Sequence, residues 1–103
     1  MKSRNRLTSE ERELVAGFIG MKDPPVYKTD KTDRILFVEL VQFDVCPYLL
    51  GKEQIDGEQY RYILDEYERY LSQTDISMLD EYAKDHFRMM VKIIDLFKEY
   101  YNM

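Results

Sequence analysis

Tryptophan is absent from this chain of 103 residues, and the chain has only one cysteine, three prolines and four glycines. Because so few residues favour tight turns, a β fold rich in turns is disfavoured. The lone Cys46 cannot form a disulfide within the chain, which favours a reducing compartment. The longest apolar run, residues 45–50, is far shorter than the ~20 residues of a membrane span, and the charged amino-terminal segment lacks the apolar region of a secretory signal. We therefore expect a soluble, cytoplasmic protein that does not bind a membrane.

The acidic charge is concentrated in the second half of the chain. Residues 1–51 carry eight basic and eight acidic side chains, whereas residues 52–103 carry seven and twelve, so the net charge of −5 arises there. Binding to phosphate needs a basic surface, so we expect no direct contact between this half and nucleic acid. Three basic residues, Lys2, Arg4 and Arg6, lie in a segment (1–7) that we expect to be a flexible arm.

The segment from Thr8 to Gly20 has the pattern of an amphipathic helix. Thr8 and Glu11 have the spacing of a capping box, in which each side chain binds the backbone amide of the other residue. Gly20 stands where helices commonly end. An apolar stripe lies between them and consists of Leu14, Val15, Phe18 and Ile19.

The next segment, residues 21–33, is predicted to be a connection, because Pro24 and Pro25 prevent a helix from continuing. Loops of this length are often functional. The sequence leaves open whether this one recognises a partner or only joins two elements.

Residues 34–45 could form a helix or a strand. Their β-branched and aromatic side chains fit a buried strand. As a helix they would follow a cap at Thr32. They would then carry one apolar face, formed by Leu36, Leu40, Phe43 and Val41. We favour the helix.

This helix is expected to end near Cys46, because a proline disfavours helical geometry in the residue before it. In an alternative arrangement, Pro47 begins a short helical turn that Gly51 closes.

Two longer amphipathic helices are predicted in the second half. The first follows Asp56, a residue type that commonly caps helices, and its inner face consists of Tyr60, Ile63, Leu64, Tyr67 and Leu71. The second begins near Ile76 and has an apolar seam with alternating spacings of three and four, as in a heptad. The seam consists of Ile76, Leu79, Ala83, His86, Met90, Ile93, Phe97 and Tyr100.

These patterns together predict an all-α fold. We expect one domain (1–103), a compact bundle of four to five helices with the carboxy-terminal helix as its spine. The second choice is an α+β fold with a small hairpin near residues 25–43.

No motif for catalysis, phosphate binding or metal binding stands out. His86 is the only histidine, and a helical Glu-x-x-His metal motif fails because residue 83 is alanine. Cys46 lies in an apolar stretch, which is typical of a buried and inert thiol. We expect His86 to be a partly buried, hydrogen-bonded packing residue, and the protein to be no enzyme and to use no cofactor or metal.

The sequence Leu-Asp-Glu-Tyr occurs twice, at residues 64–67 and 79–82. If the last two helices pack antiparallel across a short turn, the two copies lie near the same end of the bundle. Their outward carboxylates, with tyrosines beside them, would then form one acidic surface that attracts a basic protein. The predicted partner-binding residues are Tyr62, Asp65, Glu66, Glu68, Tyr70, Asp80, Glu81 and Asp85.

The sequence thus favours a small, acidic, non-enzymatic binding protein that inhibits or regulates a protein with a basic surface. In one version of this hypothesis, the acidic surface occupies the nucleic-acid groove of its partner through its similar charge. A second hypothesis is a structural module that forms a homodimer through the carboxy-terminal helix. A third is a small helical enzyme or ligand carrier, with His86 or Cys46 facing a cavity.

Overall fold

The structure is a computed structural model that describes residues 7–25 and 34–102, and every regular element in these ranges is a helix. The elements are α1 (Ser9–Ile19), α3 (Arg34–Leu40), the π-helix η1 (Val41–Val45), α4 (Cys46–Leu49), α5 (Gly57–Ser72), the 3₁₀ turn η2 (Ile76–Met78) and α6 (Glu81–Tyr101). The predicted all-α fold is confirmed. The hairpin near residues 25–43 is wrong, because residues 34–43 are helical. The expected Thr32 cap lies outside the described residues.

Helix α1 begins and ends where the sequence predicts. The Thr8 hydroxyl accepts the Glu11 N–H at 3.1 Å, and the Glu11 carboxylate accepts the Thr8 N–H at 2.9 Å, which completes the capping box. Val15 and Phe18 are buried, and the helix ends before Gly20. Local sequence signals therefore fix this helix at both ends.

The amino-terminal boundary of the domain differs from the prediction. Leu7, which we expected in a flexible arm over residues 1–7, is buried with the core. An apolar side chain directly before a helix cap commonly packs on the structure that follows. The other residues of the expected arm, 1–6, lie outside the described part of the chain.

Residues 34–49 form one continuous helix that contains a π-turn. The Cys46 N–H donates to the carbonyl of Val41, five residues earlier, as in a π-helix. In a regular α-helix, the ring of Pro47 would collide with the carbonyl of the residue four positions earlier. The wider π-turn accommodates the proline. The expected end near Cys46 is therefore wrong, because the helix continues through Pro47.

The helix ends instead at Leu49, and Gly51 closes it. Gly51 adopts the left-handed conformation (φ 78°), which a side chain would strongly disfavour. The N–H of the next residue, Lys52, donates to the Pro47 carbonyl at 2.9 Å, as in a Schellman motif. The predicted closure at Gly51 is thus confirmed.

The π-turn also keeps one face of this helix on the core. At roughly 100° per residue, positions four apart in an α-helix drift by roughly 40° at each step, so four such positions would spread over roughly 120° of the helix surface. A π-turn fits an additional residue into one turn and removes most of this drift. Four positions spaced by four residues are accordingly all buried: Phe37, Val41, Val45 and Leu49.

Helix α5 is capped at Asp56 as predicted, but its inner face differs from the predicted one. Tyr70 is buried and packs on Phe37 with ring centroids 5.0 Å apart, whereas Leu71 is exposed. Both residues lie about one turn beyond Tyr67, so helical spacing alone cannot choose between them. The larger aromatic side chain takes the inner position.

Helix α6 begins at Glu81, later than predicted. Asp80 caps it by accepting the Ala83 N–H at 2.8 Å, and residues 76–78 form the turn η2 instead. Ile76, which we expected in the seam, is therefore exposed. The remainder of the predicted seam is buried: Leu79, Ala83, His86, Met90, Ile93, Phe97 and Tyr100.

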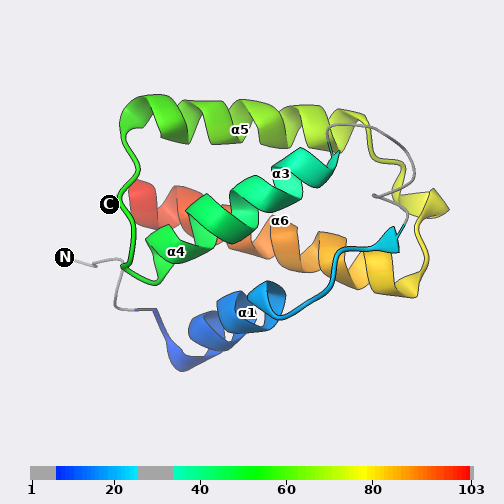
Figure 1. Cartoon of the computed structure of the whole chain (residues 1–103), viewed down its shortest axis with the longest axis horizontal. Coiled ribbons are helices and arrows are strands. Elements are labelled where there is room, and N and C mark those ends of the chain that lie inside the picture. Colours follow the sequence, from blue (N-terminus) through cyan, green and yellow to red (C-terminus); the bar gives the residue numbers. More distant parts are fainter. Residues whose placement is uncertain (1–6, 26–33, 103) are drawn as a thin grey trace.

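The bundle is organised around α6, as predicted. Helix α6 packs directly on α1, η1 and α4, whereas α5 packs closely on α3 and runs antiparallel to α6 (Figure 1). Aromatic side chains join α5 to α6: Tyr60 stacks on Tyr101 with ring centroids 4.0 Å apart, and Tyr70 meets Phe87 at 6.0 Å. The radius of gyration, 13.4 Å, is that of one compact domain of this length.

Candidate functional site

A hollow of about 300 Å³ lies between the continuous α3–η1 helix and α5, two segments that are neighbours in Figure 1. We call it the α3–α5 groove. Four of its lining side chains are apolar or aromatic, and three are carboxylates. The lining residues are Leu36, Glu39, Leu40, Phe43, Asp44, Tyr62 and Glu66.

The apolar wall of this groove is the face that the sequence predicts to be the apolar face of this helix. Leu36, Leu40 and Phe43 follow helical spacing and share a face, as predicted. However, Val41 and Val45 point to the core, so Phe43, midway between them in the π-turn, points outward. Phe43 is 68% exposed and Leu36 is 55% exposed. The expectation that this face is shared with Val41 is therefore wrong.

Tyr62 forms the opposite wall of the groove on α5, and it is 55% exposed. Three large apolar or aromatic side chains, Leu36, Phe43 and Tyr62, are thus exposed around one hollow. Clustered apolar surface of this kind commonly marks a site of interaction. The π-turn that presents Phe43 is itself a feature found frequently at functional sites.

Carboxylates surround the apolar walls. Glu39 and Asp44 approach from the α3–η1 side, and Glu66 approaches from α5. The pKa of Asp44 is raised from its usual value of 3.8, mainly because burial removes water from it and also because Glu53 is close. Glu66 lies 3.8 Å from the guanidinium of Arg69. The rim therefore contains one carboxylate whose charge is disfavoured, Asp44, and one that lies beside a cation, Glu66.

Tyr62 also lines a second hollow, at the beginning of α5. This hollow contains three more carboxylates and one arginine. It is lined by Asp56, Gly57, Glu58, Arg61, Tyr62 and Asp65. Because the two hollows share Tyr62, one acidic surface extends from α3 to the first turns of α5.

The structure brings together three of the predicted partner-binding residues: Tyr62, Asp65 and Glu66 line this acidic surface. Glu68 is exposed on α5 but lines neither hollow. Tyr70 is only 1% exposed, so the prediction that it is a surface anchor is wrong. Its ring packs between α3 and α6, so no part of the ring is exposed for contact with a partner.

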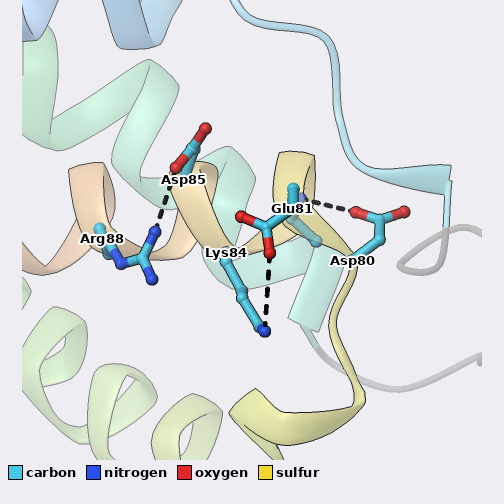
Figure 2. A network of polar contacts seen from close by, with 6 residues as sticks. Asp80, Glu81, Lys84, Asp85 and Arg88 are labelled. Atoms are coloured by element: carbon cyan, nitrogen blue, oxygen red, sulfur yellow. Dashed lines mark hydrogen bonds and ion pairs between the residues drawn. The ribbon is translucent and has the colours of Figure 1, made fainter.

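The predicted residues at the start of α6 have other contacts (Figure 2). Asp80 caps the helix through the Ala83 N–H. Glu81 lies 3.9 Å from the ammonium of Lys84, and Asp85 lies 3.1 Å from the guanidinium of Arg88. Each of these ion pairs is at spacing i, i+3 within one helix. The acidic charge here is partly balanced within α6.

The structure does not place the two Leu-Asp-Glu-Tyr segments in one patch. Asp65 lies in the second hollow at the beginning of α5, whereas Asp80 and Tyr82 line a separate hollow together with Lys22, Asp23 and Pro25. The helices are antiparallel as expected. However, the connection includes η2 and is longer than the short turn that we assumed. The single acidic surface predicted from the repeated segment is therefore wrong.

His86 and Cys46 line neither the α3–α5 groove nor the two other hollows described above. His86 is fully buried rather than partly buried, with its ring 4.8 Å from that of Phe18, and burial lowers its pKa to about 4 against the opposing charge of Asp23. Cys46 is buried as predicted, and burial raises the pKa of its thiol to about 12.

The seam of α6 is also enclosed within the chain. The side chains expected to pair with a second copy, such as Met90, Ile93 and Phe97, have no exposed surface. A homodimer that uses this seam would require the bundle to open.

Comparison with protein-family models, with curated proteins and with solved structures finds no match to this chain. Among residues 7–25 and 34–102, no group of three or more His, Cys, Asp or Glu side chains is arranged to hold a metal ion. No helix in these ranges has both the length and the apolar composition needed to cross a bilayer. The α3–α5 groove combines exposed Leu36, Phe43 and Tyr62 with three carboxylates.

Proposed function

We propose that this chain is a small, non-enzymatic binding protein that inhibits or regulates a protein partner with a basic surface. Its binding surface is the α3–α5 groove together with the adjoining acidic hollow, which share Tyr62. The observation that carries the proposal is the combination of exposed apolar side chains, Leu36 and Phe43, with a rim of carboxylates.

The two components of this surface have different roles in binding. Aromatic and aliphatic side chains at the centre of an interface supply most of the affinity once water is excluded. Carboxylates at its rim increase the rate of encounter with a basic partner and disfavour acidic partners. A surface that acted only by resembling the charge of nucleic acid would have no use for an exposed Phe43.

The test is affinity capture from lysate of the source cells, at low and at high salt, with the unchanged protein and two charge-reversed variants. Asp65→Lys/Glu66→Lys replaces two negative charges of the acidic surface on α5 by positive ones. Glu81→Lys/Asp85→Lys reverses the same number of charges at the start of α6, and it is the matched control. We expect the first variant to lose a basic partner that the second retains.

Circular dichroism must show that both variants keep their helix content. If both variants retain every captured protein, or if both lose the same one, the groove is not the binding surface. If the only captured protein is a second copy of this chain, the result would support a self-associating module instead.

A further inference from the structure

The lining of the α3–α5 groove determines which kind of backbone it can accept. An extended segment carries N–H and C=O groups that need partners when water is displaced. Among the lining side chains in the part of the chain that the structure describes, only the Tyr62 hydroxyl can donate a hydrogen bond, because the others are apolar groups and carboxylates. A helix pairs its backbone groups internally and needs no donor from the groove. The groove therefore favours a helical ligand over an extended one.

The apolar wall has the spacing by which one helix packs on another. Leu36, Leu40 and Phe43 lie at positions i, i+4 and i+7 of one helix, and Tyr62 faces them from α5. A ligand helix with an apolar stripe of the same period would pack its ridge between these two walls. It would cover the side chains that α3 and α5 leave exposed.

The rim determines the charge of the ligand helix. Glu39 and Asp44 would meet the residues on one side of its apolar stripe, and Glu66 would meet those on the other. Glu66 also lies 3.8 Å from the Arg69 guanidinium. Burial and the neighbouring Glu53 both disfavour the ionised form of Asp44, and a cationic side chain beside it would offset both effects. Lysine and arginine therefore fit these flanking positions.

We propose that the α3–α5 groove binds a basic, amphipathic helix of the partner protein. The apolar stripe of that helix lies between Phe43 and Tyr62, and its lysine and arginine side chains pair with the carboxylates of the rim. This inference rests on the proposed function and adds the structural class of the segment that is recognised.

The experiment uses three fluorescein-labelled peptides of about 15 residues, a length at which a helix is marginal in water and can be stabilised by binding. All three have the same composition of leucine, lysine and alanine. In the first, leucine follows helical spacing. In the second it alternates with lysine, as in a strand, and in the third the order is scrambled. Fluorescence anisotropy measures affinity, and ¹⁵N–¹H spectra of the full chain locate the binding site.

Matched variants separate the groove from the remaining surface. Phe43→Ala removes an exposed aromatic group from the groove, and Met78→Ala removes an exposed apolar group from η2, where the side chain is 79% exposed. Both positions are exposed, so neither change threatens the fold. We expect the helix-spaced peptide to bind tightest. Phe43→Ala should weaken it roughly tenfold or more, and Met78→Ala less than twofold.

Three results would overturn the inference. The first is equal binding of the helix-spaced and alternating peptides. The second is a Phe43→Ala variant that binds the helix-spaced peptide as tightly as the unchanged protein does. The third is a dimer, seen by sedimentation, that Phe43→Ala dissociates, because this would assign the groove to a second copy of the chain. If no peptide binds but capture from lysate still depends on Asp65 and Glu66, the helical ligand is wrong and the proposed function stands. If capture is also independent of these charges, both are wrong.

Discussion

Two helical faces in this molecule have similar apolar patterns and opposite surroundings. The part of the seam that lies in α6, from Ala83 to Tyr100, is buried beneath its neighbours and includes His86, Met90 and Phe97. The face of α3 and η1 that carries Leu36 and Phe43 is open to solvent. Both faces follow helical spacing, and the sequence predicts each to be the apolar face of its helix. Spacing identifies a continuous apolar face, but the remainder of the chain determines whether anything covers it.

The acidic side chains near these two faces differ in a parallel way. Asp80, Glu81 and Asp85 at the start of α6 cap the helix or pair with cations within it. In the groove, Asp44 lies beside another carboxylate, and its pKa is raised. Glu66 in the groove also pairs with a cation of its own helix, Arg69, so the contrast rests on Asp44, whose surroundings disfavour its charge. The following predictions test this distinction, beginning with the largest effect.

The first prediction compares two phenylalanines. Phe97 is buried and its ring lies 5.4 Å from Tyr48 and 5.1 Å from Tyr60, so Phe97→Ala should lower the free energy of unfolding by ~3–5 kcal/mol. Phe43→Ala removes a ring of the same size from the surface and should change the free energy of unfolding by less than ~0.5 kcal/mol. Unfolding in urea, monitored by circular dichroism, measures both. Similar losses in the two variants would show that the groove face is covered in solution.

The second prediction concerns the pH dependence that the buried seam imposes through His86. Burial lowers its pKa from 6.5 to about 4, so between these values the unfolded chain binds a proton that the folded chain does not. The free energy of unfolding should therefore fall as the pH decreases from about 6.5 to about 4, by up to about 3 kcal/mol in total. His86→Phe replaces the imidazole by an aromatic ring that does not titrate, and so removes this contribution. The difference between the two pH profiles isolates it, and identical profiles would contradict the prediction.

The third prediction separates the acidic residues of α6 by their contacts. Asp80→Ala removes the cap on the Ala83 N–H and should cost about 1 kcal/mol of stability. Glu81→Gln removes an exposed ion pair with Lys84 and should cost less than ~0.5 kcal/mol. Thermal unfolding of the two variants measures this difference. Equal costs would mean that the ion pair supports the fold as much as the cap does.

The helix boundaries set by local signals could be predicted from the sequence. Thr8, Asp56 and Gly51 act within one or two turns of their own position, and the structure bears out each of them. The π-turn could not be predicted, because it results from two requirements together. The helix must accommodate Pro47, and it must keep a row of four positions spaced by four residues, from Phe37 to Leu49, on the core.

The candidate site could be predicted only in part. Tyr62 and Glu66 were identified from the acidic, aromatic composition of α5, and the structure places both in the groove. The opposite wall was missed, although Leu36 and Phe43 were recognised as sharing a face. Whether that face is exposed depends on the π-turn and on where α5 packs, and neither is encoded in local spacing.

The smallest predicted effect concerns Asp44, and its sign is opposite to that of His86. A carboxyl group whose pKa is raised in the folded state binds protons more tightly there than in the unfolded chain, so its contribution to stability becomes less favourable as the pH rises. Asp44→Asn should therefore stabilise the chain at neutral pH by up to ~0.5 kcal/mol, and the gain should disappear below the ordinary carboxyl pKa of 3.8. Urea unfolding at pH 7 and pH 3 measures this, with Asp85→Asn as the matched control. If the same variant also binds the helix-spaced basic peptide more weakly, then Asp44 lowers stability and promotes binding, as expected for a carboxylate placed for a partner. A loss of stability at neutral pH would show instead that Asp44 supports the fold.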